Sequence, residues 1–453
     1  MGPVVRRWAP LCSSPERPPL SRFSPEDAAA LAGPDWIRAR RVGAAERFAS
    51  LSLPSESEEI WRYSRVADLD LDAYSPMLDG GPSGGDPPAP ATDDLPAGLA
   101  AAVASAGERA ALVIVRNGRV STIEMDPALQ ARGLVVADGA GLADGDEVLG
   151  QAAGAGVDAF TELNLAFHPG AVVVRVPAGL EVEHPVLVFQ WLDGAGTAAF
   201  PRTIVETGPD SGVTVVEHQG SADVAAFVDP VVELRAGDAS RLRYINVQDL
   251  GPSVWQIGYQ ASTVGRDASL RSTVVALGGC YARVRTDSHI DGKGGTSFLT
   301  AAYFADGDRM HDFRTLQDHV APSSTSELLF KGVVQDRGRS VYSGLIRVRK
   351  EARGTNAFQT NRNLVLSEGA SAESVPNLEI ETDDVRCSHA SAVGPIEDEQ
   401  RYYLESRGVP PDVAERLIVL GFLGEVIDQL PTPSFVAASR LAVARRLAAK
   451  EIP

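Results

Sequence analysis

The residues best suited to ligand chemistry are Cys387 and His389, which lie two positions apart in the segment 383–389. Residues two apart on an extended strand point to the same face, so a thiolate and an imidazole would meet there. Such a pair suits iron, zinc or cuprous ions. Two ligands cannot complete a tetrahedral site, so the others must come from elsewhere in the fold or from a second subunit. The alternative is a buried thiol beside a hydrogen-bonded histidine, because free cysteine is commonly buried.

Two further pairs suggest chemistry and have plainer explanations. His311 and His319 share a face if their segment is extended, and they form either a ligand pair or hydrogen-bonded groups at a corner of the fold. The neighbours Asp383 and Asp384 suggest the carboxylates of a β-helical carbohydrate-active enzyme. Adjacent strand residues face opposite sides, so we expect a solvated strand entry there instead.

Two glycine-rich segments lack the residues that a nucleotide site needs. Residues 139–144 lack the third glycine of a dinucleotide fingerprint, and residues 292–294 lack the Ser/Thr and the upstream glycine of a P-loop. We interpret both as turns. The sequence therefore predicts that this chain binds no nucleotide, and any ATP chemistry would belong to another protein.

The composition limits the compartment and the partners. Lysine and arginine number 42 against 60 acidic residues, and the net charge of -18 argues against nucleic acid or an anionic membrane as a partner. No apolar run approaches the roughly 18 residues of a membrane span. The three cysteines, Cys12, Cys280 and Cys387, cannot form a disulfide framework and indicate a reducing, cytoplasmic setting.

The elements that must position Cys387 and His389 are short strands. Runs rich in branched residues dominate up to about residue 393, and Asn117-Gly118 between two of them is a strong hairpin signal. Small residues precede these runs at intervals of 29, 28 and 29 at Ala239, Ala268, Thr296 and Thr325, and then at intervals of 15 at Ser340, Thr355 and Ala370. A period that halves predicts a β-solenoid whose coils pass a fixed corner, with an antiparallel sandwich as the alternative.

The length of 453 residues, with 44% hydrophobic content, predicts one large and one or two small domains. A capping signature at Ser24 and helical periodicity up to Leu51 predict helices near the N-terminus. Pro410 and Pro411 open a C-terminal helix. We expect a disordered tail at 1–23, a helical region at 24–74, a linker at 75–100, a small α/β region at 101–160, the solenoid core at 161–395 and a helical domain at 396–453.

Several segments closely resemble the SufB/SufD family of iron–sulfur cluster assembly, and among its members the SufD type. The best matches cover roughly residues 310–430, and the Cys-Ser-His block followed by the Tyr-Leu-x-Ser-Arg-Gly helix is specific. The matching segments are 361–367, 370–380, 383–389 and 402–408, with 61–63 and 318–322 further upstream. Ala370 stands where SufB-type chains carry a cysteine, which favours the SufD type.

The resemblance implies a right-handed parallel β-helix with helical ends and a scaffold role without catalysis. It implies pairing with a SufB-type paralogue through the β-helix, and a transient iron–sulfur cluster at their interface with His389 as a ligand and Cys387 as a neighbouring candidate. It further implies that a SufC-type ATPase binds the C-terminal helices, through Tyr402, Tyr403, Arg407, Phe422, Glu425 and Val426. A purely structural adaptor for that ATPase and, less favoured, the carbohydrate-active enzyme are the alternatives.

Overall fold

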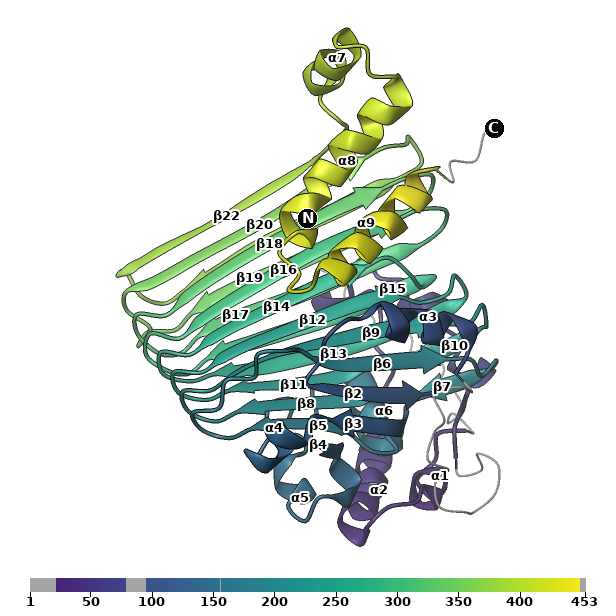
Figure 1. The fold of residues 1–453 in the computed structure, drawn as a ribbon, viewed down its shortest axis with the longest axis vertical. Helices are drawn as coiled ribbons and strands as arrows, with labels where there is room; N and C mark the ends of the chain where they lie inside the picture. Colours follow the sequence, from purple (N-terminus) through teal and green to yellow (C-terminus); the bar gives the residue numbers. More distant parts are fainter. Residues whose placement is uncertain (1–21, 79–94, 155, 449–453) are drawn as a thin grey trace, which may run out of the picture.

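The computed structural model describes residues 22–78, 95–154 and 156–448, and most of its strands stack in two parallel sheets (Figure 1). Sheet A contains β5 (Val172–Val176), β8 (Arg202–Thr207), β11 (Val231–Ala236), β13 (Val254–Val264), β15 (Tyr281–Ile290), β17 (Met310–His319), β19 (Arg339–Val348) and β21 (Ser371–Ile380). Sheet B contains β6 (Val186–Leu192), β9 (Gly212–Ser221), β12 (Arg241–Asp249), β14 (Ser269–Ala276), β16 (Thr296–Ala305), β18 (Thr325–Val334), β20 (Thr355–Val365) and β22 (Val385–Gly394).

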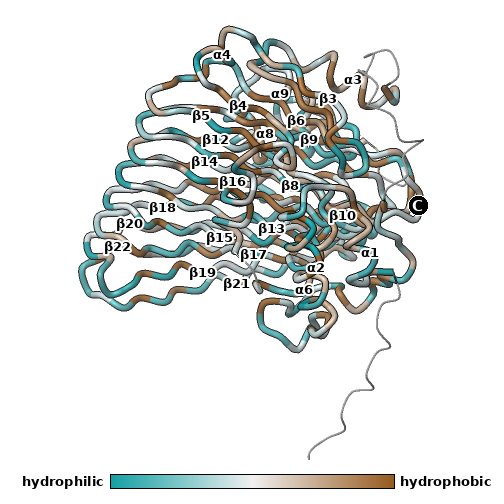
Figure 2. The backbone as a smooth tube through the Cα atoms, turned by 90° about the horizontal axis from the view of Figure 1, so that it is seen from below, coloured by the Kyte–Doolittle hydropathy of each residue, from teal (hydrophilic) through white to brown (hydrophobic). Residues whose placement is uncertain are grey.

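Each of these strands pairs in parallel with the strand one coil away, in its own sheet. The chain therefore forms a β-solenoid with helical ends, which confirms the predicted fold and excludes the antiparallel sandwich. Figure 2 shows the successive turns stacked from β4 and β5 at one end to β21 and β22 at the other.

The spacing of small residues reflects this geometry. Thr296 and Thr325 are direct partners in the register of β16 and β18, one full coil apart. The step of 15 residues from Ser340 to Thr355 carries the chain from β19 in sheet A to β20 in sheet B. The long period is thus one coil and the short one is half a coil.

A β-hairpin and one antiparallel strand close the first coil. The hairpin of β2 (Ala111–Arg116) and β3 (Arg119–Met125) turns at Asn117 and Gly118, whose φ angles of 49° and 85° suit the predicted Asn-Gly turn. Strand β2 joins sheet B beside β6, and β4 (Val135–Asp138) joins sheet A beside β5. These strands cover hydrogen-bonding edges that would otherwise be open at this end.

Helices cover parts of both sheets. At the N-terminal end lie α1 (Pro25–Ala30), α2 (Asp35–Ser50), α3 (Ala97–Ser105), α4 (Pro127–Ala131), α5 (Gly145–Val148) and α6 (Ala159–Phe167), with short strands β1 (Ser75–Pro76), β7 (Thr197–Ala199) and β10 (Ala226–Val228) added to sheet A. Ser24 and Asp27 form the predicted capping box. The predicted tail at 1–23 and linker at 75–100 lie largely outside the described residues.

The C-terminal helices are α7 (Asp398–Ser406), α8 (Pro411–Ile427) and α9 (Pro433–Ala448). Helices α8 and α9 lie across sheet B, whereas α7 stands beyond the last coil (Figure 1). Val419, Leu423 and Val443 are fully buried in the apolar cluster between these helices and the sheet. Within the described ranges, none of the helices combines the length and the apolar character needed to cross a bilayer.

A buried charge cluster fixes the segment before β1 to the outside of sheet A. Asp312 accepts hydrogen bonds from Arg283 Nη1 at 2.8 Å and from Arg314 Nε at 2.6 Å. The same two guanidinium groups donate to the carbonyl oxygens of Ile60 and Arg62. Arg283 also lies 3.8 Å from the centre of the Trp61 ring.

Candidate metal-ligand site

Cys387 and His389 lie on β22, the last strand of sheet B. In the register with β20, Cys387 stands opposite Ala357 and His389 opposite Gln359. Ala357 and Gln359 are buried, whereas Phe358 between them is 43% exposed, so the first two point into the solenoid. Cys387 and His389 follow the same alternation and share the inner face, as their spacing predicts.

The two candidate ligands differ in their surroundings. Cys387 is half-buried against the apolar cluster of Ile346, Val348 and Ala357. This burial raises the pKa of the Cys387 thiol, so the free cysteine is a neutral thiol at neutral pH. His389 is exposed. Metal binding would have to displace the thiol proton, which a soft cation does readily.

The last coil leaves this inner face open. Strands β21 and β22 each end their sheet, and both carry mostly exposed or half-buried side chains. Ser391 on β22 donates to Ser374 on β21 at 2.7 Å, which links the two sheets across the interior. Apolar Ile380 and Val393 are 43% and 46% exposed at this end. The candidate ligands therefore stand at an open solenoid end with unpaired strand edges.

The site is incomplete within the described part of the chain. Across the residues that the structure describes, no three His, Cys, Asp or Glu side chains gather in a way that could hold a metal ion. Cys387 and His389 provide two donors of the right kind, and further donors would have to approach through the open end.

His311 and His319 are not a ligand pair. Both are fully buried on the inner face of β17. His319 bonds to the hydroxyls of Ser324 and Ser326, and His311 Nε2 donates to the carbonyl of Phe304 at 3.2 Å. Burial lowers the pKa of His311 to about 3 and that of His319 to about 4, so both are neutral core residues.

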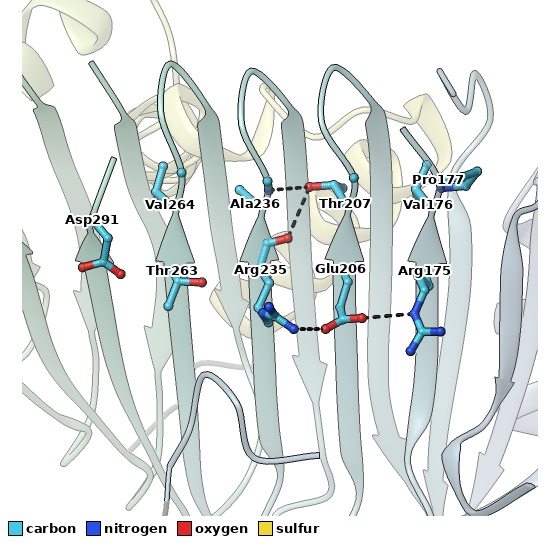
Figure 3. A pocket seen from close by; sticks show the side chains of 13 residues that line it. Arg175, Val176, Pro177, Glu206, Thr207, Arg235, Ala236, Thr263, Val264 and Asp291 are labelled. Carbon is cyan, nitrogen blue, oxygen red and sulfur yellow. Dashed lines mark hydrogen bonds and ion pairs between the residues drawn. The ribbon is translucent and has the colours of Figure 1, made fainter. Parts of the chain in front are cut away.

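A hollow lies far from Cys387, on the outer face of sheet A near its other end (Figure 3). It is a shallow groove of about 490 Å³ crossed by ion pairs between neighbouring strands. Glu206 accepts from Arg175 at 3.1 Å and also pairs with Arg235. No aromatic side chain is among the described residues that line it. The groove therefore lacks the aromatic platform expected of a carbohydrate-active enzyme.

The six residues expected to bind an ATPase fall into two groups. Tyr402 and Tyr403 on α7 are 73% and 58% exposed, and Arg407 lies over the Tyr403 ring at 5.2 Å. On α8, by contrast, the side chains face the solenoid. Val426 is fully buried, and both Glu425 and Phe422 contact Lys331 of β18. The structure does not bring the six together on one surface.

The roles of two residues were missed by sequence reasoning. Lys331 is nearly buried and anchors α8 through Glu425, with its ammonium 4.5 Å from the centre of the Phe422 ring. In the sequence, Lys331 stands out as a single lysine within the apolar run that forms β18. Gln359 lies beneath His389 and carried no signal, because the register that aligns them joins segments 30 residues apart.

Comparison with known proteins shows which family this chain belongs to. Residues 190–422 match the family model described as SUF system FeS cluster assembly, SufBD core domain. An iron–sulfur cluster assembly SufBD family protein of Mycobacterium tuberculosis is 38% identical over 274 residues, which cover 58% of this chain and 68% of that protein.

Two relatives carry the name SufD. The iron–sulfur cluster assembly protein SufD of Bacillus subtilis is 26% identical over 410 residues, covering 88% of this chain and 91% of that protein. The SufD of Escherichia coli is 28% identical over 278 residues, covering 60% and 66%. The family match, residues 190–422, spans just over half of the 453-residue chain and includes both candidate ligands, and the chain belongs to the SufBD family of iron–sulfur cluster assembly proteins.

Proposed function

We propose that this chain is a scaffold subunit for iron–sulfur cluster assembly that performs no catalysis itself. The observation that carries the proposal is the placement of Cys387 and His389 on the inner face of an open solenoid end, in a chain of this family. A scaffold needs ligands that hold its cargo without enclosing it. An open end with two donors meets that need.

His389 is the proposed cluster ligand and Cys387 its companion. An imidazole and a thiolate are both established types of iron–sulfur ligand. The half-buried thiol stays protonated in the free chain, which protects it from oxidation until iron arrives. The cluster is cargo, shared with a second subunit that supplies the missing donors.

A SufB-type paralogue is the proposed second subunit. The edges of β21 and β22 offer unpaired backbone groups, and Ile380 and Val393 add apolar surface beside them. A second solenoid end would continue both sheets and bury these residues. Its own ligands would then face Cys387 and His389 across the junction.

A SufC-type ATPase is the proposed partner of the C-terminal helices. The exposed rings of Tyr402 and Tyr403 provide the kind of aromatic contact that dominates protein interfaces. Phe422, Glu425 and Val426 would act on the other side of the same helical unit, where they tie α8 to the solenoid. ATP-driven movement of the bound ATPase would reach the solenoid through α8.

The test is the variant His389→Ala in a complex co-expressed with the SufB-type and SufC-type proteins of the same genome. We expect visible absorbance from the cluster to fall severalfold while all three subunits still co-purify. The exposed His184→Ala serves as the control, because His184 lies between β5 and β6, at the opposite end of the solenoid. Unchanged cluster absorbance in His389→Ala would favour the alternative, a purely structural adaptor for the ATPase.

A further inference from the structure

Gln359 is a buried side chain directly below His389 whose amide has no partner. It is 1% exposed, and neither its Oε1 nor its Nε2 atom has a hydrogen-bond partner. A buried amide without partners costs free energy, and natural proteins rarely leave both of its atoms unmet. We infer that Gln359 is a binding residue of the site, whose amide N–H donates a hydrogen bond to the sulfide of the iron–sulfur species held by His389 and Cys387.

The unmet amide stands at the boundary between a closed and an open coil. In the same inner row of sheet B, Leu299 and Leu328 lie below Gln359. His389 lies above it. The leucines provide no hydrogen-bonding group on the lower side of the amide, whereas its upper side faces the open end. The row changes from apolar to polar one coil before the solenoid ends.

Other buried amides of the same strand are satisfied. Asn361 donates to the Tyr303 hydroxyl at 3.0 Å, and Asn363 donates to Asn361 at 2.8 Å. Tyr303 in turn donates to Asn363 at 2.8 Å. The chain can therefore complete polar networks inside this coil, and the exception at Gln359 is local to the place beneath His389.

The opposite wall leaves room for the amide. A Cβ atom on Gly344 of β19 would lie 2.5 Å from Gln359 Oε1 and 2.0 Å from the Tyr342 hydroxyl. Gly344 thus allows the glutamine to extend across the interior as a floor for the last coil. Above this floor stand Cys387, His389 and the bridging Ser391.

The chemistry of the floor suits sulfide. The cargo carries negative charge on its sulfur atoms, and hydrogen bonds to those atoms stabilise it and raise its reduction potential. The polar groups of this floor are neutral: the amide of Gln359 and the phenol of Tyr342. A neutral donor can hold the cargo without the strong binding of a lysine or arginine, which fits a site that must release what it assembles.

The inference rests on the proposed function, and Gln359→Met tests it. Methionine has similar volume and no hydrogen-bonding hydrogen. The matched control is Gln317→Met, which replaces another buried inner-face glutamine with an unpartnered Oε1, placed on β17 away from the end. Each variant is measured twice, as the free full-length chain by thermal unfolding and in the co-expressed complex by redox titration of the cluster.

We expect Gln359→Met to leave the melting temperature of the free chain unchanged or higher, because the lost amide had no partner. In the complex we expect a more negative midpoint potential for Gln359→Met and the wild-type value for Gln317→Met. An unchanged midpoint, or a marked fall in the melting temperature, would overturn the role of Gln359. The absence of cluster absorbance from the wild-type complex would instead overturn the proposed function. Full cluster absorbance in the His389→Ala complex would overturn it as well.

Discussion

Lys331 of β18 and Glu425 of α8 form an ion pair that joins the C-terminal helices to the solenoid. The lysine side chain is 6% exposed and the glutamate 53% exposed, so the pair lies at the border between core and solvent. The Phe422 ring covers the ammonium from α8 as well. Because of this contact, a movement of α8 would reach β18, which is separated from β22 in sheet B by β20 alone.

Glu425→Leu should destabilise the chain more than Lys331→Met does. The first variant leaves a nearly buried ammonium without its counter-charge, whereas the second removes that charge altogether. We expect a loss of about 1–3 kcal/mol in the free energy of unfolding for Glu425→Leu, measured by urea titration. Equal losses from the two variants would show that the pair adds no specific stability.

Asp312→Asn should strongly destabilise the docking of the 59–63 segment. Asp312 is fully buried between Arg283 and Arg314, and the two guanidinium groups keep the pKa of its carboxyl below the usual range despite its burial. Removing its charge leaves two buried cations, for a cost of about 3–5 kcal/mol in urea unfolding. The control is Asp308→Asn, which changes an exposed carboxylate paired with Arg337 and should have little effect.

The chain should lose stability in mild acid. Burial lowers the pKa of His311 from 6.5 to about 3, so between these pH values the unfolded chain binds a proton at His311 and the folded chain does not. This contribution is fully present above pH 6.5 and is lost as the pH falls from 6.5 towards 3. His311→Gln should reduce the slope of unfolding free energy against pH in this window by up to about 1.4 kcal/mol per pH unit. A slope in His311→Gln equal to that of the wild-type chain would contradict this role of His311.

The double variant Tyr402→Ala, Tyr403→Ala should weaken ATPase binding at least tenfold without changing the melting temperature. Both rings are exposed on α7, so their truncation removes contact area at an interface but no core packing. Binding to the SufC-type protein is measured by calorimetry. Leu441→Ala on α9 is the matched control, since Leu441 is 51% exposed and lies on a different helix. Equal binding by wild type and double variant would contradict the assignment of α7.

Local signals in the sequence predicted local structure well. The Asn117-Gly118 turn, the Ser24 cap and the shared face of Cys387 and His389 all follow from conformational preferences within a few residues. The 29-residue spacing also revealed the solenoid, because a repeated corner leaves a repeated small residue.

Contacts between distant segments were beyond such reasoning. Pro410 and Pro411 predicted the start of a C-terminal helix, but the direction of its buried face depends on sheet B, and Val426 turned out to be buried against the solenoid. The unmet amide of Gln359 depends on what lies one coil below and one coil above it. Only the register of the strands sets those neighbours.

The position of β22 has a thermodynamic consequence. Its backbone hydrogen bonds run to β20 alone, so it is held by one neighbour where inner strands are held by two. In a one-dimensional array of coils, the terminal unit frays first, and its amide hydrogens exchange fastest. A partner that docked on β22 would lower the entropy of this strand in advance, so the affinity for the proposed metal cargo and the affinity for the partner would be coupled and would rise and fall together.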